Sequence, residues 1–474
     1  MAPRRQRHSQ SGGSARSTKQ RPWQVAGVVA AAALILGFAA EAGRSGNLPG
    51  FASAQNSQLR TVIEAEAPDL AAVYQARRYA PIWVKGDKVR PEAQELVALI
   101  ASAGQDGLEP ERYGLSHLKQ DLTAAATGEP AALARFELDA SQAYVSYVSD
   151  LHSPAAGEKM IYTDPAAAPR PMARADILLA AAEAPSLSDH FDTVRTMNPV
   201  YEGLRKDLAR YRAQHRSKTP DANEQLILLN LERARALPAN PGRRYIIVDA
   251  AAAMLWMYQD GKLVDSMKVI VGKQNEPTPL MAGMIRYAMF NPYWNVPEDL
   301  VSEGWAPRVL AQGPQVFTEK NMEALSDWSP NAHVLDPASI DWRAVAAGQY
   351  LRVRQKPGAG NMMGNVKFML PNDLGIYLHD TPNKALFAST ERWFSSGCVR
   401  LEDAPRLTRW LFGETPNAPT PDYRVDLKEP VPVYITYFTA APGPSGVTFR
   451  RDIYGRDAVS MAALAEQRDL DKAA

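Results

Sequence analysis

The spacing of apolar residues changes once along the chain, near residue 240. Between residues 58 and 237, apolar side chains recur every three or four positions, as in RPEAQELVALIASAG and ARFELDASQAYVSYVSDL. This is the period of helices that bury one face. The proline- and glycine-containing stretch ALPANPGRR at 236–244 ends the pattern. We therefore predict a mainly helical domain over residues 58–237, and we find no catalytic grouping of side chains within it.

After this break the apolar residues form short runs that are typical of strands. RRYIIVDAAAAMLWMYQDGKLVDSMKVIVGK contains two such runs joined by Asp260-Gly261, which is a hairpin signal. GMIRYAMFNPYWNVP, VKFMLPNDLGIYLHD and VPVYITYFTA are further candidate strands, and EDAPRLTRWLFG is typical of a helix closed by Gly413. We predict a mainly β domain over residues 243–440, followed by a strand and a helix within 441–474.

Residues 297–366 interrupt the strand pattern. WAPRVLAQGPQVF, a short helix expected around NMEALSDW at 321–328, and the glycine-rich KPGAGNMMGN follow one another without a regular period. Irregular segments of this length are usually lids or binding loops. The expected fold class is therefore a multidomain α+β protein, in which a helical domain precedes a mainly β domain that carries a lid insertion.

The first forty residues are distinct from the rest. Residues 1–22 carry six basic side chains and no acid, and residues 23–40 carry no charge at all. The uncharged segment is long enough to cross a bilayer, and its basic flank predicts a cytoplasmic N-terminus. The long apolar core favours an uncleaved signal-anchor over residues 23–41, although Ala40-Glu41-Ala42 resembles a cleavage site, so a removable signal peptide stays open. Both alternatives predict that residues 43–474 are exported.

The charge balance and the cysteine content narrow the function. The chain has 53 basic and 52 acidic residues, which gives no sign of nucleic-acid binding. Cys398 is the only cysteine, whereas exported proteins usually use cysteines in pairs as disulfides. One cysteine and one histidine make a poor zinc site, so no metal or other cofactor is expected. Cys398 is thus either a structural thiol or a reactive one.

A reactive thiol needs a nearby base, because an ordinary cysteine is mostly protonated at neutral pH. Of the seven histidines, His379 is the best candidate, since it ends a predicted strand one loop before Cys398. Gly397 permits a tight turn whose N–H, with that of Cys398, could bind an oxyanion. Arg400 could bind a substrate carboxylate through two hydrogen bonds. On the residues alone, the catalytic and structural alternatives both stay open.

The stretch HDTPNKALFASTERWFSSGCVRL resembles the active-site signature of the L,D-transpeptidases, whose YkuD-type pattern is H-G-T followed by S-H-G-C-V-R-L. The YcbB-like branch of that family resembles residues 244–273, the PTP at 277–279, FNPYWNVP, VPVYITYFTA and FRRDIYGRDA, and its scaffold domain resembles residues 58–237. That branch usually carries a small peptidoglycan-binding domain between the two regions. Here RYRAQHRSKTPDANEQLILLNLERARALP joins them directly, so this binding domain is expected to be absent.

Two positions depart from the family signature. Ser396 stands where a histidine usually precedes Gly-Cys, and Asp380 stands where glycine usually follows the first histidine. The resemblance therefore implies an enzyme with Cys398 as nucleophile and His379 as its single base. It also implies that the thiolate attacks the L-configured end of meso-diaminopimelate in a tetrapeptide stem and expels D-Ala. A second diaminopimelate amine would then resolve the thioester and form a 3–3 cross-link.

The resemblance places other residues around this centre. Oxyanion donors are expected at the backbone N–H groups of Gly397 and Cys398, and the Tyr377 hydroxyl is a further candidate, with a core aromatic as the equal alternative. Ser396 and Arg400 are expected on the substrate side. Trp393 is a candidate for the substrate groove, although aromatic residues at such positions more often belong to the core.

The resemblance also implies a setting and partners. It places the enzyme in the periplasm at the inner membrane, in cell-wall synthesis and cell shape, downstream of a D,D-carboxypeptidase that supplies tetrapeptide, and makes it carbapenem-sensitive. Hydrolysis of stems or of wall-attached protein by the same thiol is an alternative. A non-catalytic wall-binding scaffold is an alternative of another class, which the joint presence of His379, Gly397, Cys398 and Arg400 disfavours. A thiol redox protein is disfavoured because a partner cysteine is lacking.

Overall fold

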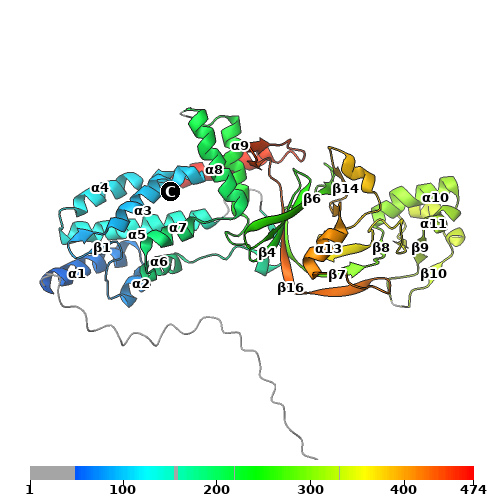
Figure 1. Cartoon of the computed structure of the whole chain (residues 1–474), viewed down its shortest axis with the longest axis horizontal. Coiled ribbons are helices and arrows are strands. Elements are labelled where there is room, and N and C mark those ends of the chain that lie inside the picture. The colour runs from blue at the N-terminus through cyan, green and yellow to red at the C-terminus, as the bar shows by residue number, and fades with distance from the viewer. Residues whose placement is uncertain (1–48, 154–158, 218, 330, 474) are drawn as a thin grey trace, which may run out of the picture. The chain divides into compact units, whose positions relative to one another are not determined.

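The computed structural model describes residues 49–153, 159–217, 219–329 and 331–473 (Figure 1). The expected basic tail at 1–22 and signal-anchor at 23–41 lie outside these residues. Within the described part of the chain, no helix combines the length and the apolar character that crossing a membrane requires.

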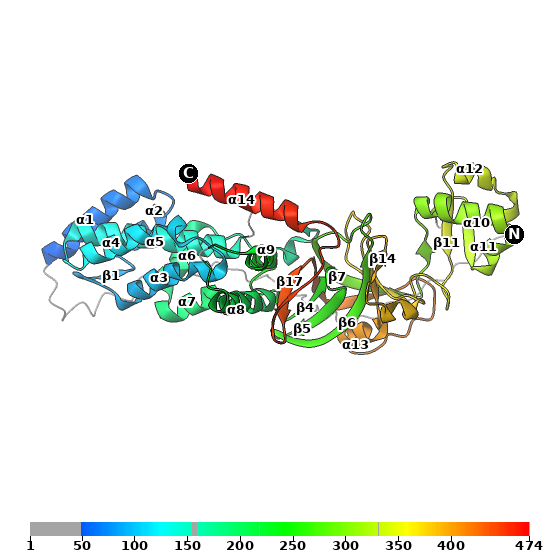
Figure 2. The ribbon, with the colours of Figure 1, turned by 90° about the horizontal axis from the view of Figure 1, so that it is seen from above.

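The expected helical N-terminal region is confirmed, and its long helix α5 lies at its centre. Pro130 occupies the first turn of α5, where its missing N–H costs nothing, and the helix runs without glycine to His152. Helices α3, α4 and α6 pack against it (Figures 1 and 2). The helices are α1 (Pro49–Glu66), α2 (Ala71–Ala76), α3 (Pro91–Ala101), η1 (Ala103–Asp106), η2 (Pro110–Tyr113), α4 (Leu115–Ala125), α5 (Pro130–His152), η3 (Pro165–Ala167), α6 (Arg174–Glu183), α7 (Leu187–Arg195), α8 (Pro199–Gln214) and α9 (Ala222–Arg235).

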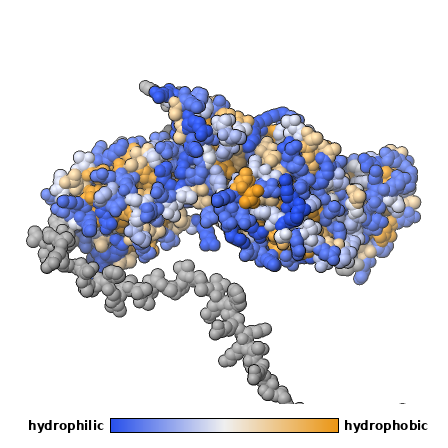
Figure 3. All heavy atoms as spheres, viewed as in Figure 1, coloured by the Kyte–Doolittle hydropathy of each residue, from blue (hydrophilic) through white to orange (hydrophobic). Residues whose placement is uncertain are grey.

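Side-chain caps fix where several of these helices begin. Ser186, Asn198 and Asp221 accept hydrogen bonds from backbone N–H groups in the first turns of α7, α8 and α9. The apolar faces of the helices then close over a core that includes Trp83, Tyr144 and Phe136. The outer surface is left mostly hydrophilic on the face shown in Figure 3, where apolar residues form only small patches.

The helical region also contains strands that the helical period did not predict. β1 (Val84–Lys85) and β2 (Lys88–Val89) form a short antiparallel hairpin. β3 (Ile161–Tyr162) pairs in parallel with β7 (Met281–Phe290) of the later sheet, and Thr163 N–H donates to the Ala282 carbonyl at 2.8 Å. Runs of two residues are too short to produce a detectable alternation, so the sequence carries no signal for them.

The C-terminal part is built around one sheet, as the β-rich expectation requires. Its strands follow the order β12-β13-β15-β6-β5-β4-β16-β7, and β12 also pairs with β7, which closes the sheet on itself. Closure leaves few free strand edges and encloses an apolar core. The strands are β4 (Arg244–Asp249), β5 (Met254–Gln259), β6 (Lys262–Gly272), β7 (Met281–Phe290), β12 (Val366–Met369), β13 (Leu378–His379), β14 (Trp393–Ser395), β15 (Val399–Leu401) and β16 (Tyr423–Thr436).

Two local predictions about this domain are confirmed. Asp260 and Gly261 both have positive φ, 51° and 73°, and they join the antiparallel strands β5 and β6. Helix α13 (Ala404–Phe412) begins after Asp403, whose carboxylate accepts the Arg406 N–H at 2.9 Å, and ends at Gly413 with φ 84°.

The insertion has its own small core rather than the irregular structure expected of a loop. Phe317, Trp342 and Val353 are buried together in it. The prediction of a helix around NMEALSDW is wrong, because Met322–Leu325 is strand β9 and pairs with β11. The elements are β8 (Trp294–Asn295), η4 (Leu300–Trp305), α10 (Ala306–Gln312), α11 (Gln315–Glu319), β9 (Met322–Leu325), β10 (Val334–Leu335), η5 (Pro337–Ser339), α12 (Trp342–Ala346) and β11 (Arg352–Gln355).

The last segment of the chain lies against both α9 and the sheet. It contains β17 (Ala440–Gly443), β18 (Gly446–Phe449) and α14 (Asp457–Ala473). Asn230 of α9 exchanges two hydrogen bonds of 3.0 Å with Thr439, and Arg233 donates to the Asp457 carboxylate at 2.7 Å. The C-terminal segment is therefore tied to the end of the helical region.

Candidate active site

Neighbouring strands bring His379 and Cys398 to one place in the sheet. β13 and β15 are parallel, with Leu378 opposite Val399 and His379 opposite Arg400. The Val399 N–H donates to the Tyr377 carbonyl at 3.2 Å, which sets Cys398 beside the start of β13. Strand pairing therefore places the backbone of the strand-end histidine on the strand next to the one that follows the cysteine.

The Cys398 thiol is half-buried and weakly hydrogen-bonded. Its Sγ donates to the Gly375 carbonyl at 3.5 Å. Burial raises the pKa of this thiol, while hydrogen bonds from Tyr377 and the charge of Arg400 act in the opposite direction. Burial dominates, so the resting side chain is a protonated thiol and not a preformed thiolate.

The His379 imidazole is buried, with 2% of its surface exposed. Its Nδ1 lies 2.6 Å from the Asp380 carbonyl oxygen, which can only accept, so Nδ1 carries the proton and Nε2 has the lone pair. Burial first and the nearby Arg400 charge second lower the pKa of His379 to about 3. His379 is consequently a neutral base of fixed tautomer at physiological pH.

The turn before the nucleophile is fixed from below by a buried threonine. Gly397 has φ +104°, and a Cβ added there would stand 3.1 Å from Ile376 Cδ1. The Thr278 hydroxyl donates to the Gly397 carbonyl at 2.7 Å and accepts the Gly272 N–H at 2.8 Å. The Tyr454 hydroxyl donates to the Gly272 carbonyl at 2.8 Å, so the C-terminal segment supports the same turn.

Arg400 is the cation of the site. It lies opposite His379 in the strand register and is half-buried. Its charge lowers the pKa values of both His379 and Cys398. Across the described residues its guanidinium donates no hydrogen bond within the chain, so its donor groups are available to a ligand carboxylate.

Comparison with protein families assigns the two halves of the chain. Residues 68–208 match the scaffold domain family, and residues 243–433 match the L,D-transpeptidase catalytic domain of the YkuD type. Residues 243–433 are an L,D-transpeptidase catalytic domain. The scaffold and transpeptidase domains are joined through the end of α8 and through α9.

Individual relatives agree with this assignment to different degrees. A curated Haemophilus influenzae protein, whose name proposes an L,D-transpeptidase, is 29% identical over 82% of this chain and 78% of its own. The solved L,D-transpeptidase of Mycobacterium smegmatis is 15% identical, with a TM-score of 0.20 over 41% of this chain and 58% of that one. The solved catalytic domain of the Enterococcus faecium enzyme is 16% identical, with a TM-score of 0.19 over 40% of this chain and 95% of that one. This chain thus spans less than two thirds of the Mycobacterium chain.

Asp380, which replaces the usual glycine of the transpeptidase signature, anchors the loop that carries the base. Its buried carboxylate accepts Lys384 Nζ at 2.7 Å and the Asn365 N–H at 2.9 Å. Lys384 Nζ also donates to the Leu401 carbonyl at 3.0 Å. Gly364 lies so close to this carboxylate that a Cβ would overlap it. The sequence gives no sign of these contacts, because a lysine in a polar loop is ordinarily solvated.

Tyr377 lies against the nucleophile of the transpeptidase domain. Its ring is 5.7 Å from the His379 ring, and the tyrosine lowers the pKa of the Cys398 thiol. Lys367 Nζ stands 5.9 Å from the same ring. Tyr377 therefore favours the thiolate form of Cys398.

Ser396 and Trp393 are close to Cys398 in sequence, but their side chains contact other groups than the thiol. Ser396 is exposed, and its hydroxyl hydrogen-bonds Glu276, whose pKa is lowered by Lys273 and then by this contact. Trp393 is half-buried and packs against the apolar core of the sheet, in the strand paired with β6. No group of three or more potential metal ligands occurs among the described residues.

Proposed function

We propose that this protein is a peptidoglycan L,D-transpeptidase that forms 3–3 cross-links between meso-diaminopimelate residues through a Cys398 thioester. The proposal rests on the neutral His379 ring, whose Nδ1–H donates a hydrogen bond to the Asp380 carbonyl. His379 ends strand β13, which pairs with β15, the strand that follows Cys398. A fixed neutral base next to a lone thiol is the arrangement that nucleophilic thiol catalysis requires.

The first half-reaction acylates the thiol. As Sγ attacks the carbonyl at the L-centre of diaminopimelate, its proton passes to Nε2 of His379. The C–S bond forms, the C–N bond to D-Ala breaks, and His379 returns the proton to the departing amine. Because the thiol pKa is raised and the imidazole pKa is depressed, this proton moves during the attack and not before it.

The charge that develops in this step needs donors. The backbone N–H groups of Gly397 and Cys398 are candidates, since the positive φ of Gly397 and the Thr278 hydrogen bond fix the turn that presents them. Tyr377 assists by favouring the thiolate form of Cys398. Arg400, which has free donor groups, binds a carboxylate of the stem peptide.

The second half-reaction transfers the acyl group to the side-chain amine of another diaminopimelate. His379 removes a proton from this amine as it attacks the thioester, the C–S bond breaks, and the proton returns to Sγ. Water in place of the amine would give tripeptide, which is the hydrolase alternative. The burial of His379 favours the amine, because bulk water is kept from the base.

We infer a periplasmic location, with residues 23–41 as the inner-membrane anchor, from the basic, then uncharged, N-terminal sequence. The donor stems must already lack their fifth residue, so a D,D-carboxypeptidase acts upstream.

The proposal is tested by incubating the chain with a diaminopimelate-containing disaccharide tetrapeptide and measuring product masses. The expected product is a cross-linked dimer that has lost D-Ala. Cys398→Ala removes the nucleophile and abolishes this product, together with any carbapenem adduct at residue 398.

The other outcomes are equally specific. Tripeptide as the sole product supports hydrolysis over transfer. An adduct that persists in Cys398→Ala shows that another group is the nucleophile. A folded parent chain that leaves the tetrapeptide unchanged contradicts an enzymatic role and favours a wall-binding scaffold.

A further inference from the structure

The scaffold domain contains an open cavity of about 390 Å³, well outside the transpeptidase strands. It lies between η1, the end of α7 and the start of α8. This volume is in the range of small-molecule sites. Charged and polar side chains line it, namely Gln105, Asp192, Arg195, Thr196, Glu202 and Arg205.

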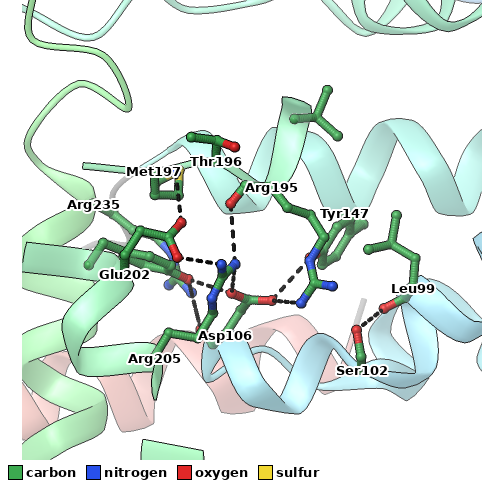
Figure 4. Close-up of polar contacts among 12 residues, drawn as sticks. Leu99, Ser102, Asp106, Tyr147, Arg195, Thr196, Met197, Glu202, Arg205 and Arg235 are labelled. Atoms are coloured by element: carbon green, nitrogen blue, oxygen red, sulfur yellow. Dashed lines mark hydrogen bonds and ion pairs between the residues drawn. The ribbon is translucent and has the colours of Figure 1, made fainter. Parts of the chain in front are cut away.

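A buried aspartate organises the floor of this cavity. Asp106 has no exposed surface, and its carboxylate accepts the Tyr147 hydroxyl at 3.0 Å and the Tyr201 hydroxyl at 3.1 Å. Figure 4 shows the guanidinium groups of Arg195 and Arg205 on either side of this carboxylate. Arg205 Nη1 donates to it at 3.4 Å. Asp106 is therefore nearly saturated by groups other than Arg195.

Arg205 is also fully engaged. It pairs with Glu202, and its Nη1 donates to the Arg195 carbonyl at 3.2 Å. Glu202 in turn accepts the Met197 N–H at 2.9 Å. These contacts fix Arg205 and Glu202 as wall groups of the cavity and leave little capacity for a ligand.

Arg195 differs from its neighbours. Its one ion pair in the described part of the chain joins Nη2 to Asp106 Oδ2 at 4.0 Å, and its guanidinium donates no hydrogen bond there. Nε is buried without a partner, although 28% of the side chain is exposed and the residue lines the cavity. The Nη1 and Nη2 groups are not buried and donate no hydrogen bond in the described part of the chain, so a carboxylate in the cavity can bind both of them in a bidentate manner.

An acidic group stands next to this arginine. Asp192 precedes Arg195 by one helical turn on α7, so the two side chains project from the same face. Asp192 is exposed, and its carboxylate has no partner among the residues that the structure describes. A carboxylate that can bind a cation thus lies within one helical turn of a guanidinium that can bind an anion.

We propose that this cavity binds a zwitterionic α-amino acid head group, with its carboxylate on Arg195 and its ammonium on Asp192. The inference rests on the proposed function for the source of the ligand: the D-centre of diaminopimelate in a stem peptide carries this head group, free of the peptide backbone. The scaffold domain is then a second peptidoglycan contact, separate from the catalytic site.

The test uses the full chain with Cys398→Ala, which binds ligands without turning them over. Hydrogen exchange is followed by mass spectrometry with free meso-diaminopimelate, with disaccharide tetrapeptide and with pimelate, which lacks both amines. The first two probes are expected to protect residues 187–205. Arg195→Gln is expected to raise the ligand concentration needed for half of the full protection at least tenfold, because the bidentate contact is lost.

Two further variants make the result specific. Asp192→Asn alters an exposed group and is expected to weaken binding of the two amine-containing probes but not of pimelate. Arg216→Gln removes a charge from an exposed scaffold position outside the cavity and is the matched control, and thermal unfolding of each variant checks the fold. Absence of protection at 187–205 with every probe, or protection that Arg195→Gln and Asp192→Asn leave unchanged, overturns the proposal. Because Cys398→Ala performs no chemistry, these outcomes are independent of whether the parent chain forms cross-links.

Discussion

The scaffold domain and the catalytic domain both bury ionisable side chains, and they treat them in opposite ways. In the scaffold, the Glu137 carboxylate accepts the Tyr74 hydroxyl at 2.8 Å and the backbone N–H groups of Ile82 and Trp83. In the catalytic domain, the buried His379 ring makes a single hydrogen bond among the described residues, through Nδ1. The Glu137 carboxylate is thus surrounded by hydrogen-bond donors, whereas Nε2 of His379 has no hydrogen-bond partner among the described residues.

A shifted pKa does not separate these two cases. Burial is the main cause for both groups, and it raises the pKa of Glu137 to about 7 and lowers that of His379 to about 3. The difference lies in unfilled hydrogen-bonding capacity. Glu137 uses its oxygens to hold two chain segments together, whereas Nε2 of His379 is available to take a proton.

The largest expected effect comes from removing the free base. His379→Ala should lower the rate of cross-linked dimer formation about a thousandfold, because the Cys398 pKa is raised and, among the described residues, the neighbours that affect this pKa, Tyr377 and Arg400, are not bases at neutral pH. The measurement is single-turnover product formation at pH 7. His117→Ala, an exposed histidine on α4, is the matched control. A loss of less than tenfold would show that another group activates the thiol.

The scaffold counterpart is a pH-dependent change in stability. Protonated Glu137 contributes fully to the free energy of unfolding below its ordinary pKa of 4.5. This contribution is lost as pH rises through about 7, because the unfolded chain releases the proton at a lower pH than the folded chain does. Relative to Glu137→Gln, the parent should therefore lose about 3 kcal/mol of unfolding free energy between pH 4.5 and 8. Chemical denaturation at several pH values measures the difference. Glu95→Gln, at an exposed site, controls for the lost carboxylate, and parallel pH curves for parent and Glu137→Gln would refute the assignment.

A group that supports the nucleophile turn should have an intermediate effect. Thr278→Val removes a buried hydroxyl of nearly the same volume and leaves the Gly397 carbonyl and Gly272 N–H unpaired. An unpaired buried group costs about 1–3 kcal/mol. We expect about a tenfold loss in kcat with little change in KM, because the turn positions the nucleophile and does not bind the stem. Thr278→Ser keeps the hydroxyl and should restore the rate. Equal losses in Val and Ser variants would indicate a packing role only.

The local features of both domains could be predicted from the sequence, because short-range signals determine them. The Asp260-Gly261 hairpin, the Gly413 helix end and the change of apolar period near residue 240 need no knowledge of the fold. The contacts of Lys384 and Thr278 could not be predicted in the same way. Thr278 lies 119 residues from Gly397 and Lys384 lies 17 residues from Leu401, and neither residue type is distinctive in its own neighbourhood.

The same limit applies to the paired charges of the scaffold. Asp106 and Arg195 lie on different helices in stretches that are ordinarily polar, so their spacing along the chain gives no signal. By contrast, the sequence could predict that the strand ending at His379 lies next to the one after Cys398, because the two strands follow one another along the chain with one loop region between them.

The smallest expected effect is that of pH on the rate of carbapenem acylation, which should stay nearly constant. Below pH 6.5 an ordinary histidine takes up a proton, but burial keeps His379 neutral to about pH 3. The reactive pair of thiol and neutral imidazole should therefore persist from pH 7 to 5.5, and carbapenem acylation followed by intact mass should vary less than twofold. Because the unfolded chain does bind this proton, the depressed pKa also lowers stability as pH falls from 6.5, so thermal unfolding must show that the chain is folded at each pH. A tenfold fall in acylation by a folded chain at pH 5.5 would mean that His379 titrates as an exposed base, and the contrast with Glu137 would then rest on hydrogen bonding alone.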